Sequence, residues 1–193
     1  RIYALTSTPA ETLRRYTGTT EADRYARAIA YTRQGKLTDA TQLMDELLKS
    51  HPSDYFYRAM QADLAIEQGN LTGAETILTQ LLKEDPSQIL LRYQLGDVQR
   101  NLEKPAAALP NLEAAAEDWP DWPAPWSSLG VVYGQLGRLT ESHLALTEAA
   151  LAQGDALTAR QQLALAKNYL TKTPDGHLKT WADALESRLA ELQ

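Results

Sequence analysis

The stretch WSSLGVVY, residues 126–133, decides the fold. It follows the pattern W-x2-L-G-x2-Y in full. Prolines extend the frame outward, because Pro52, Pro86 and Pro120 follow one another at intervals of 34 residues. A fixed period of this length predicts one small helical unit that is stacked several times.

Glycines and small side chains repeat in the same frame. Gly35 and Gly69 occupy one turn position, and Gly137 occupies it two units later. A small residue at the eighth and twentieth positions lets the two helices of a unit approach closely, and each unit needs neighbours to bury its apolar face. Alanine and leucine dominate while valine and isoleucine are scarce, which predicts an all-α chain. The small residues beyond the turns are Ala40, Ala74, Ala108 and Ser142, and the large residues expected to fill the space between units are Met44, Leu47, Leu78, Leu81, Leu112 and Leu146.

The proline period, the glycine period and the complete motif resemble the tetratricopeptide repeat (TPR) family over about residues 21–154. The resemblance implies an all-α superhelical solenoid of antiparallel helix pairs with flanking capping helices. We therefore expect an N-terminal helical connector over residues 1–20, about four 34-residue units over residues 21–154, and C-terminal capping helices over residues 155–193.

The two ends of the chain carry their own helix signals. Residues 1–6 are interpreted as the tail of a helix that begins before the first residue of the chain. The segment TPAE, residues 8–11, has the pattern of a capping box and predicts a short helix that ends at Arg15. Beyond the repeats we predict one helix over about residues 157–171 and a last helix that ends at Leu192.

The third unit departs from the frame. Glu103-Lys104-Pro105 stands where a glycine turn is usual, and Pro110 lies inside the expected second helix. A proline inside a helix removes one backbone hydrogen bond. We expect that this helix starts late or is bent near Pro110.

Composition excludes several classes of protein. The chain has 193 residues, with 19 Lys and Arg against 25 Asp and Glu and a net charge of −6, and no basic cluster provides the footprint that phosphate backbones require. No apolar run reaches the ~18 residues that a membrane span needs. Zero cysteines exclude disulfides, thiolate zinc sites and a cysteine nucleophile. We expect no nucleic-acid partner and no membrane span.

Catalytic motifs are missing from the sequence as well. There is no G-x-S-x-G nucleophile elbow, no glycine-rich phosphate loop and no HExxH zinc motif. A zinc site needs three or four convergent ligands, whereas His51, His143 and His177 are scattered and are interpreted as surface or packing residues. We expect this chain to be no enzyme and to hold no metal or other cofactor.

The TPR resemblance places partner contacts on the first helix of each unit, at fixed positions that line a concave groove. Tyr25 and Ile29 stand where adaptors for chaperone tails carry Lys and Asn, so a carboxylate clamp is excluded. These residues could instead pack inside the solenoid, against flanking helices or against a missing protease domain. Binding a ligand and packing within the protein both bury an apolar patch that is rimmed by aromatic residues. The candidate groove residues are Tyr25, Ile29, Arg33, Phe56, Asp63, Glu67, Tyr93, Asp97, Arg100, Asn101 and Val131.

The run WPDWPAPW, residues 119–126, places two tryptophans in a connection that prolines stiffen. Rigid exposed aromatic residues are common binding anchors, so Trp119 and Trp122 form a candidate secondary aromatic patch. The interpretation that we favour is that they cover the seam between the third and fourth units.

A second resemblance is narrower. Residues 1–5, 12–16, 24–31 and 55–56 are similar to the C-terminal TPR domain of bacterial envelope HExxH zinc metalloproteases. This resemblance implies a periplasmic parent protein that acts in outer-membrane protein quality control or assembly, with its zinc outside this chain. The module would then dock the protease domain or recruit protein or peptide partners. The alternative is a free-standing TPR adaptor in a periplasmic or cytoplasmic complex.

Overall fold

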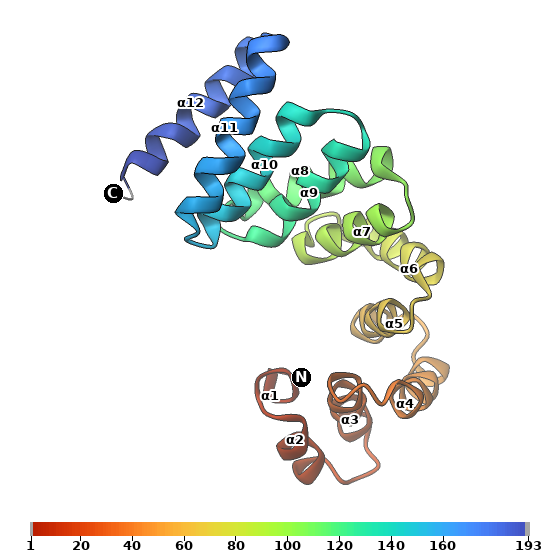
Figure 1. Cartoon of the computed structure of the whole chain (residues 1–193). Coiled ribbons are helices and arrows are strands. Elements are labelled where there is room, and N and C mark those ends of the chain that lie inside the picture. The colour runs from red at the N-terminus through yellow and green to blue at the C-terminus, as the bar shows by residue number, and fades with distance from the viewer. Residues whose placement is uncertain (1, 192–193) are drawn as a thin grey trace. The chain divides into compact units, whose positions relative to one another are not determined.

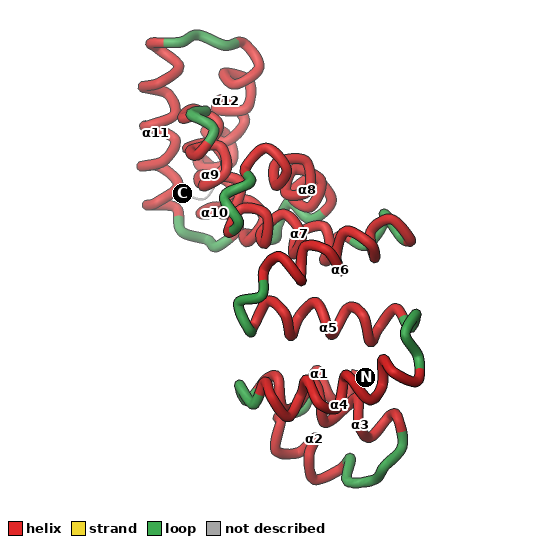
Figure 2. Tube along the Cα trace, turned by 90° about the vertical axis from the view of Figure 1, so that its right-hand side faces the viewer, coloured by secondary structure: helices red, strands yellow, loops and turns green. Residues whose placement is uncertain are grey.

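The computed structural model describes residues 2–191, with side chains from residue 4 onward, and every element in this part of the chain is an α-helix (Figures 1 and 2). The all-α prediction is confirmed. The helices form two compact units, Arg1–Ser87 and Gln88–Gln193, which are described separately. The first unit contains α1 (Ile2–Thr6), α2 (Pro9–Arg15), α3 (Glu21–Arg33), α4 (Leu37–Ser50), α5 (Tyr55–Glu67) and α6 (Leu71–Glu84). The second unit contains α7 (Ile89–Asn101), α8 (Pro105–Asp118), α9 (Pro123–Gln135), α10 (Leu139–Ala152), α11 (Ala156–Lys172) and α12 (Gly176–Glu191).

The helices follow the 34-residue frame. The first helices of the pairs, α3, α5, α7 and α9, each have 13 residues, and their partners α4, α6, α8 and α10 each have 14. Each first helix packs against its partner, and α3 and α7 also pack against the first helix of the next pair, α5 and α9 respectively. The predicted helix pairs of the TPR fold are therefore present.

Small residues at the eighth position bring the two helices of a pair together. A Cβ atom added to Gly96 would lie 2.6 Å from Cγ of Leu112, and one added to Gly130 would lie 2.6 Å from Leu146. Only a hydrogen atom fits at such distances in a close-packed interior. Leu112 and Leu146 therefore pack within their own helix pairs rather than only between neighbouring units.

The turns inside the pairs share one backbone conformation. Gly35, Gly69 and Gly137 have φ angles of 71°, 74° and 75°, in the left-handed region that glycine adopts without a steric penalty. Glu103 holds the equivalent place in the third repeat with φ of 56°. The chain thus makes the same turn there with a residue that tolerates it less well.

The predicted late start of the third repeat's second helix is wrong. Helix α8 begins at Pro105, in register with its equivalents, because the turn at Glu103 is preserved and proline suits the first position of a helix. Pro110 lies inside α8, which continues to Asp118. The bend near Pro110 stays a prediction.

The chain ends follow the sequence signals. The hydroxyl of Thr8 accepts from the backbone N–H of Glu11, and the Glu11 carboxylate accepts from the backbone N–H of Thr8, so the predicted capping box is confirmed. Two further helices, α11 and α12, pack on α10 and on each other. The predicted end at Leu192 lies outside the described residues. None of the described helices has both the length and the apolar character that crossing a bilayer requires.

Candidate partner-binding surfaces

In the first unit, the short helix α1 packs against α3 (Figure 1). Nη1 of Arg33 donates to the carbonyl oxygens of Ala4 at 2.9 Å and Ser7 at 2.6 Å, at the C-terminal end of α1. These carbonyls lack partners within a helix this short, so the guanidinium satisfies them. Arg33 is thereby engaged within the chain.

Ile29 is a correction to the predicted groove. Its side chain lies in the hydrophobic core beside Ala4 and is 3% exposed, so it offers no contact surface. The physical reason is that α1 covers this part of α3, which corresponds to the alternative of packing against a flanking helix.

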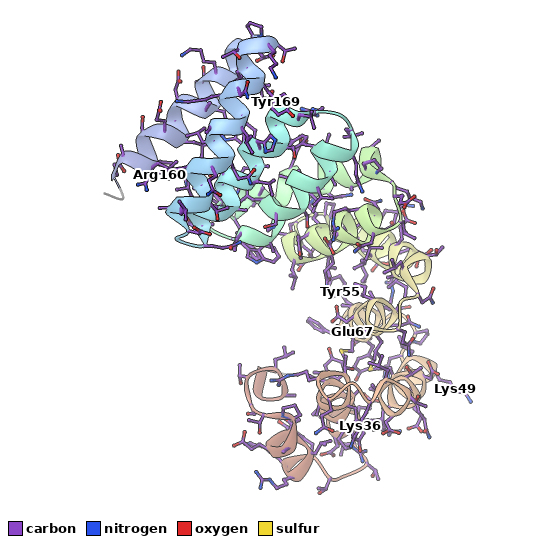
Figure 3. The ribbon with its side chains drawn as sticks, viewed as in Figure 1. Lys36, Lys49, Tyr55, Glu67, Arg160 and Tyr169 are labelled. Carbon is purple, nitrogen blue, oxygen red and sulfur yellow. The ribbon has the colours of Figure 1, made fainter. Side chains whose placement is uncertain are left out.

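Tyr25 also serves the interior of the first unit. Its hydroxyl donates to the backbone carbonyl of Phe56 at 3.2 Å, and its ring lies 5.2 Å from that of Tyr57. The Phe56 side chain is 47% exposed. On the same helix Asp63 is half-buried, and Glu67 is exposed near the C-terminal end (Figure 3). Phe56 and Glu67 are therefore candidate residues of this unit that lie exposed on α5.

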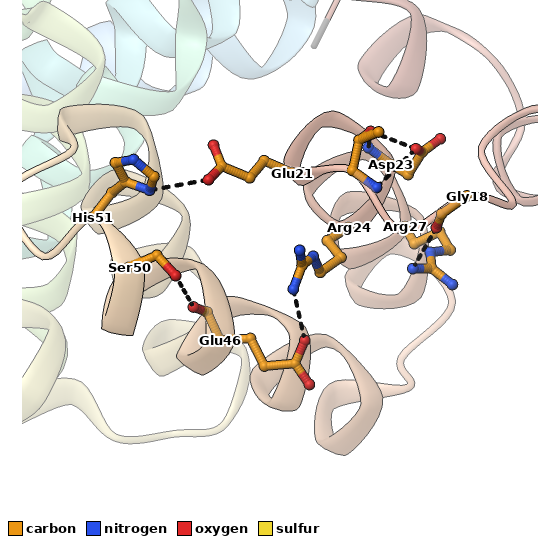
Figure 4. Close-up of polar contacts among 9 residues, drawn as sticks. Gly18, Glu21, Asp23, Arg24, Arg27, Glu46, Ser50 and His51 are labelled. Carbon is orange, nitrogen blue, oxygen red and sulfur yellow. Dashed lines mark hydrogen bonds and ion pairs between the residues drawn. The ribbon is translucent and has the colours of Figure 1, made fainter.

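The polar contacts around the start of α3 are structural. Arg24 pairs with Glu46 at 3.4 Å, Arg27 donates to the carbonyl of Gly18 at 3.1 Å, and His51 lies 3.3 Å from Glu21 (Figure 4). They tie α3 to α4 and to the connection before α3.

In the second unit, three predicted groove residues form one polar cluster with Ser128. Oδ1 of Asp97 accepts from Nε and Nη2 of Arg100 at 3.0 and 2.8 Å and from the Ser128 hydroxyl at 2.8 Å. Oδ2 of Asp97 accepts from Asn101 at 3.3 Å. Because Ser128 belongs to α9 and the others to α7, this polar cluster joins the two first helices of the unit. Charge-assisted bonds of this kind fix side-chain orientation.

Tyr93 and Val131 lie on the same two helices. Burial raises the pKa of the Tyr93 hydroxyl, the carboxylate of Asp97 adds to this rise, and a hydrogen bond with Ser128 opposes it. Tyr93 thus remains a neutral hydroxyl at physiological pH. The Val131 side chain is 44% exposed, an apolar contact on α9.

The two tryptophans of the loop between α8 and α9 differ in burial and in the role that this allows. The ring of Trp122 is half-buried and lies 4.4 Å from the ring of Tyr93, so it covers the packing between α7 and α9. Trp119 lies 5.4 Å from Trp122 and is 46% exposed. The favoured seam interpretation therefore fits Trp122, whereas Trp119 presents an aromatic surface.

The histidines and carboxylates of the described residues form no metal centre. No group of three or more His, Asp or Glu side chains there is placed to hold a metal ion. His143 hydrogen-bonds through Nδ1 to Gln162 at 2.8 Å and stacks on Tyr169, which is the packing role expected for it.

Two features were outside the predicted set of site residues. Ser128 completes the polar cluster from 31 residues away, and nothing in its local sequence marks it. Leu90 is 50% exposed and precedes Tyr93 by one helical turn. The repeat frame marks Leu90 as a groove position, because Leu90 is the equivalent of Phe56 one unit later.

Comparisons with known proteins agree with this fold. The family model for the tetratricopeptide repeat matches residues 25–89 and 93–169, so the chain belongs to the TPR family. Among solved structures, MamA from Desulfovibrio magneticus RS-1 is 19% identical with a TM-score of 0.68, over 91% of this chain and 96% of that one. A thermophilic TPR protein in Thermus thermophilus, TTC0263, is 20% identical with a TM-score of 0.53, over 90% of this chain and 98% of that one.

A third solved relative is part of a complex. A chain of the APC/C hetero-tetramer Cut9-Hcn1 is 16% identical with a TM-score of 0.64, over 92% of this chain and 39% of that one. Identities this low show the fold alone. No curated protein matches the sequence. These matches give no support to the narrower resemblance to metalloprotease domains.

Proposed function

We propose that this chain is a noncatalytic protein-interaction module that binds a peptide segment of a partner protein on the face formed by α7 and α9. The polar cluster of Asp97, Arg100, Asn101 and Ser128 carries the proposal. It holds polar side chains in fixed orientations on a partly exposed surface, where a partner finds them already ordered. Such preorganisation lowers the entropy cost of binding.

The chemistry of the face suits an extended or helical peptide. A carboxamide has two donor hydrogens and an acceptor oxygen, and Asn101 uses one donor for Asp97, which leaves groups that can pair with a peptide backbone. Leu90 and Val131 add exposed apolar contacts on the same helices. Peptide recognition commonly combines a few oriented polar groups with apolar anchors.

A peptide-display experiment tests this function. Random 12-residue peptides would be selected on the wild-type chain, and the affinity of synthetic winners would be measured by fluorescence anisotropy. We expect Val131→Asp and Arg100→Ala each to weaken these peptides about tenfold or more, as central interface residues do. Leu165→Asp is the matched control, because Leu165 is 43% exposed on α11. Selected peptides that bind all three variants equally well would refute the α7–α9 face as the site.

The metalloprotease parent is a second, finer proposal that rests on sequence similarity alone, at residues 1–5, 12–16, 24–31 and 55–56 and at the turn Gly154-Asp155. Under it the module docks a protease domain or recruits outer-membrane assembly proteins in the periplasm, and zinc belongs to that protease domain. The adaptor alternative has the better support, because the family match and the solved relatives concern TPR proteins. Sequencing the native transcript upstream of Arg1 separates the two, since only the protease parent predicts an HExxH domain there.

A further inference from the structure

The connection between α8 and α9 carries a second surface, which adjoins the α7–α9 face at Tyr93. Its aromatic platform consists of Tyr93, Trp122 and Trp119, and consecutive rings in this order lie 4.4 and 5.4 Å apart. The inner ring belongs to α7, and the outer ring of Trp119 is 46% exposed. A large aromatic ring backed by two others is held in place while one side remains open to a partner.

The backbone of the platform is rigid. The N–H of Trp122 donates to the carbonyl of Trp119 at 3.0 Å, and Nε1 of Trp126 donates to the carbonyl of Pro120 at 2.9 Å. Pro120, Pro123 and Pro125 fix three further φ angles in this stretch. Rigid aromatic side chains lose little entropy on binding, which is why they are frequent binding anchors.

Trp122 holds the position before α9 and makes no side-chain capping bond. Of the equivalent residues, Thr20 and Asp54 accept a backbone N–H at the start of their helices, whereas Gln88 makes no such cap. The side chain of Trp122 instead packs on the ring of Tyr93.

The charged residues nearest to Trp119 and Trp122 in the sequence are all carboxylates. Glu117, Asp118 and Asp121 are exposed, and the first two end α8, where the helix dipole is also negative. Helix α8 has no basic residue in its last turn. The ion pairs within residues 4–191 are made by other carboxylates. The negative charges of Glu117, Asp118 and Asp121 are therefore not neutralised by an ion pair there.

We propose that the aromatic platform binds an arginine- or lysine-bearing segment of a partner protein. An indole face attracts a cation within about 6 Å of the ring, and arginine also stacks its planar guanidinium on the ring. The flanking carboxylates pair with the neighbouring basic groups of the same segment. The opposite charge brings the segment to the platform, and the open face of Trp119 selects a flat or compact cation there.

The probe is a capped eight-residue peptide of alternating arginine and glycine, with the corresponding glutamate peptide as a negative control. Binding to the full chain is followed by NMR of the Trp119 indole N–H and by anisotropy at 50 and 300 mM salt. We expect saturable binding of the arginine peptide alone, weaker at high salt. Trp119→Ala weakens it about tenfold, and Asp118→Asn with Asp121→Asn does the same.

Asp39→Asn with Asp45→Asn is the charge-matched control, because both residues are exposed on α4 in the first unit. We expect it to leave the affinity unchanged. Equal weakening by this control would assign the binding to general acidity and overturn the proposal. Absence of saturable binding, or undiminished binding to Trp119→Ala, would overturn it as well. Dimerisation of the wild type that Trp119→Ala abolishes would assign the platform to a second copy of the chain instead. If Trp119→Ala fails to fold, the Asp118 and Asp121 pair decides.

Discussion

The carboxylate of Glu148 on α10 accepts a hydrogen bond from Nη1 of Arg188 on α12 at 2.6 Å. Its other oxygen accepts from Nε1 of Trp181 at 3.0 Å. The Glu148 side chain is 10% exposed, whereas Arg188 is about half exposed. One buried carboxylate thus fastens the last described helix to the pair before it.

Replacing Glu148 by alanine should lower the free energy of unfolding of the second unit by about 1–3 kcal/mol, because the Trp181 N–H and the Arg188 guanidinium both lose their partner. Arg188→Ala should cost less than about 1 kcal/mol, since an ion pair open to solvent on one side contributes little. Urea unfolding followed by circular dichroism gives both values. A Glu148→Ala protein as stable as wild type would show that the carboxylate holds α12 no better than water does.

The repeat architecture could be read from the sequence because each helix pair repeats the same local requirements. The small residues at Gly96 and Gly130 and the turn glycines report contacts that recur every 34 residues. The contacts of Glu148 and Ser128 escape such a reading, since their partners lie 40 and 31 residues away and no local pattern marks them.

The candidate site depends partly on contacts that the repeat does not encode. Groove positions repeat with the helices, which predicts Asp97, Arg100 and Asn101 as groove residues. The structure brings these three together, and their part in binding stays a prediction. The prediction of Ile29 as a groove residue is wrong, because α1, which lies outside the repeat frame, covers α3 and places Ile29 in the core.

Glu103 offers a stabilising substitution. A non-glycine residue in the left-handed region costs roughly 1–2 kcal/mol, and Gly35, Gly69 and Gly137 avoid this cost at the same turn. Glu103→Gly should therefore raise the free energy of unfolding by about 0.5–1 kcal/mol, after the greater freedom of glycine in the unfolded chain is subtracted. Thermal and urea denaturation measure the change. A loss of stability would mean that the Glu103 side chain supports the turn by contacts that outweigh its strain.

Two glycines of α9 provide a matched pair. Alanine in place of Gly130 would place its Cβ 2.6 Å from Leu146, whereas at Gly134 the nearest atom is the Ser142 hydroxyl at 3.5 Å. We expect Gly130→Ala to destabilise the second unit by about 1–3 kcal/mol through overpacking. Gly134→Ala should stabilise it by up to about 1 kcal/mol through helix propensity. Equal effects of the two substitutions in urea unfolding would contradict close approach as the reason for the small residue at Gly130.

Arg33 is expected to hold α1 against α3. Arg33→Ala removes the two hydrogen bonds to the carbonyls of Ala4 and Ser7, each worth about 1 kcal/mol or more for a charged donor. Hydrogen exchange of the N-terminal peptide should then accelerate about fivefold to thirtyfold, as α1 opens more often, while Arg33→Lys should keep part of the protection because an ammonium group can still donate. Unchanged exchange in the alanine variant would show that packing of Ala4 alone retains α1. Accelerated exchange would identify α1 as a displaceable cover over Ile29, and peptides selected on Arg33→Ala but not on wild type would then report the face that α1 conceals.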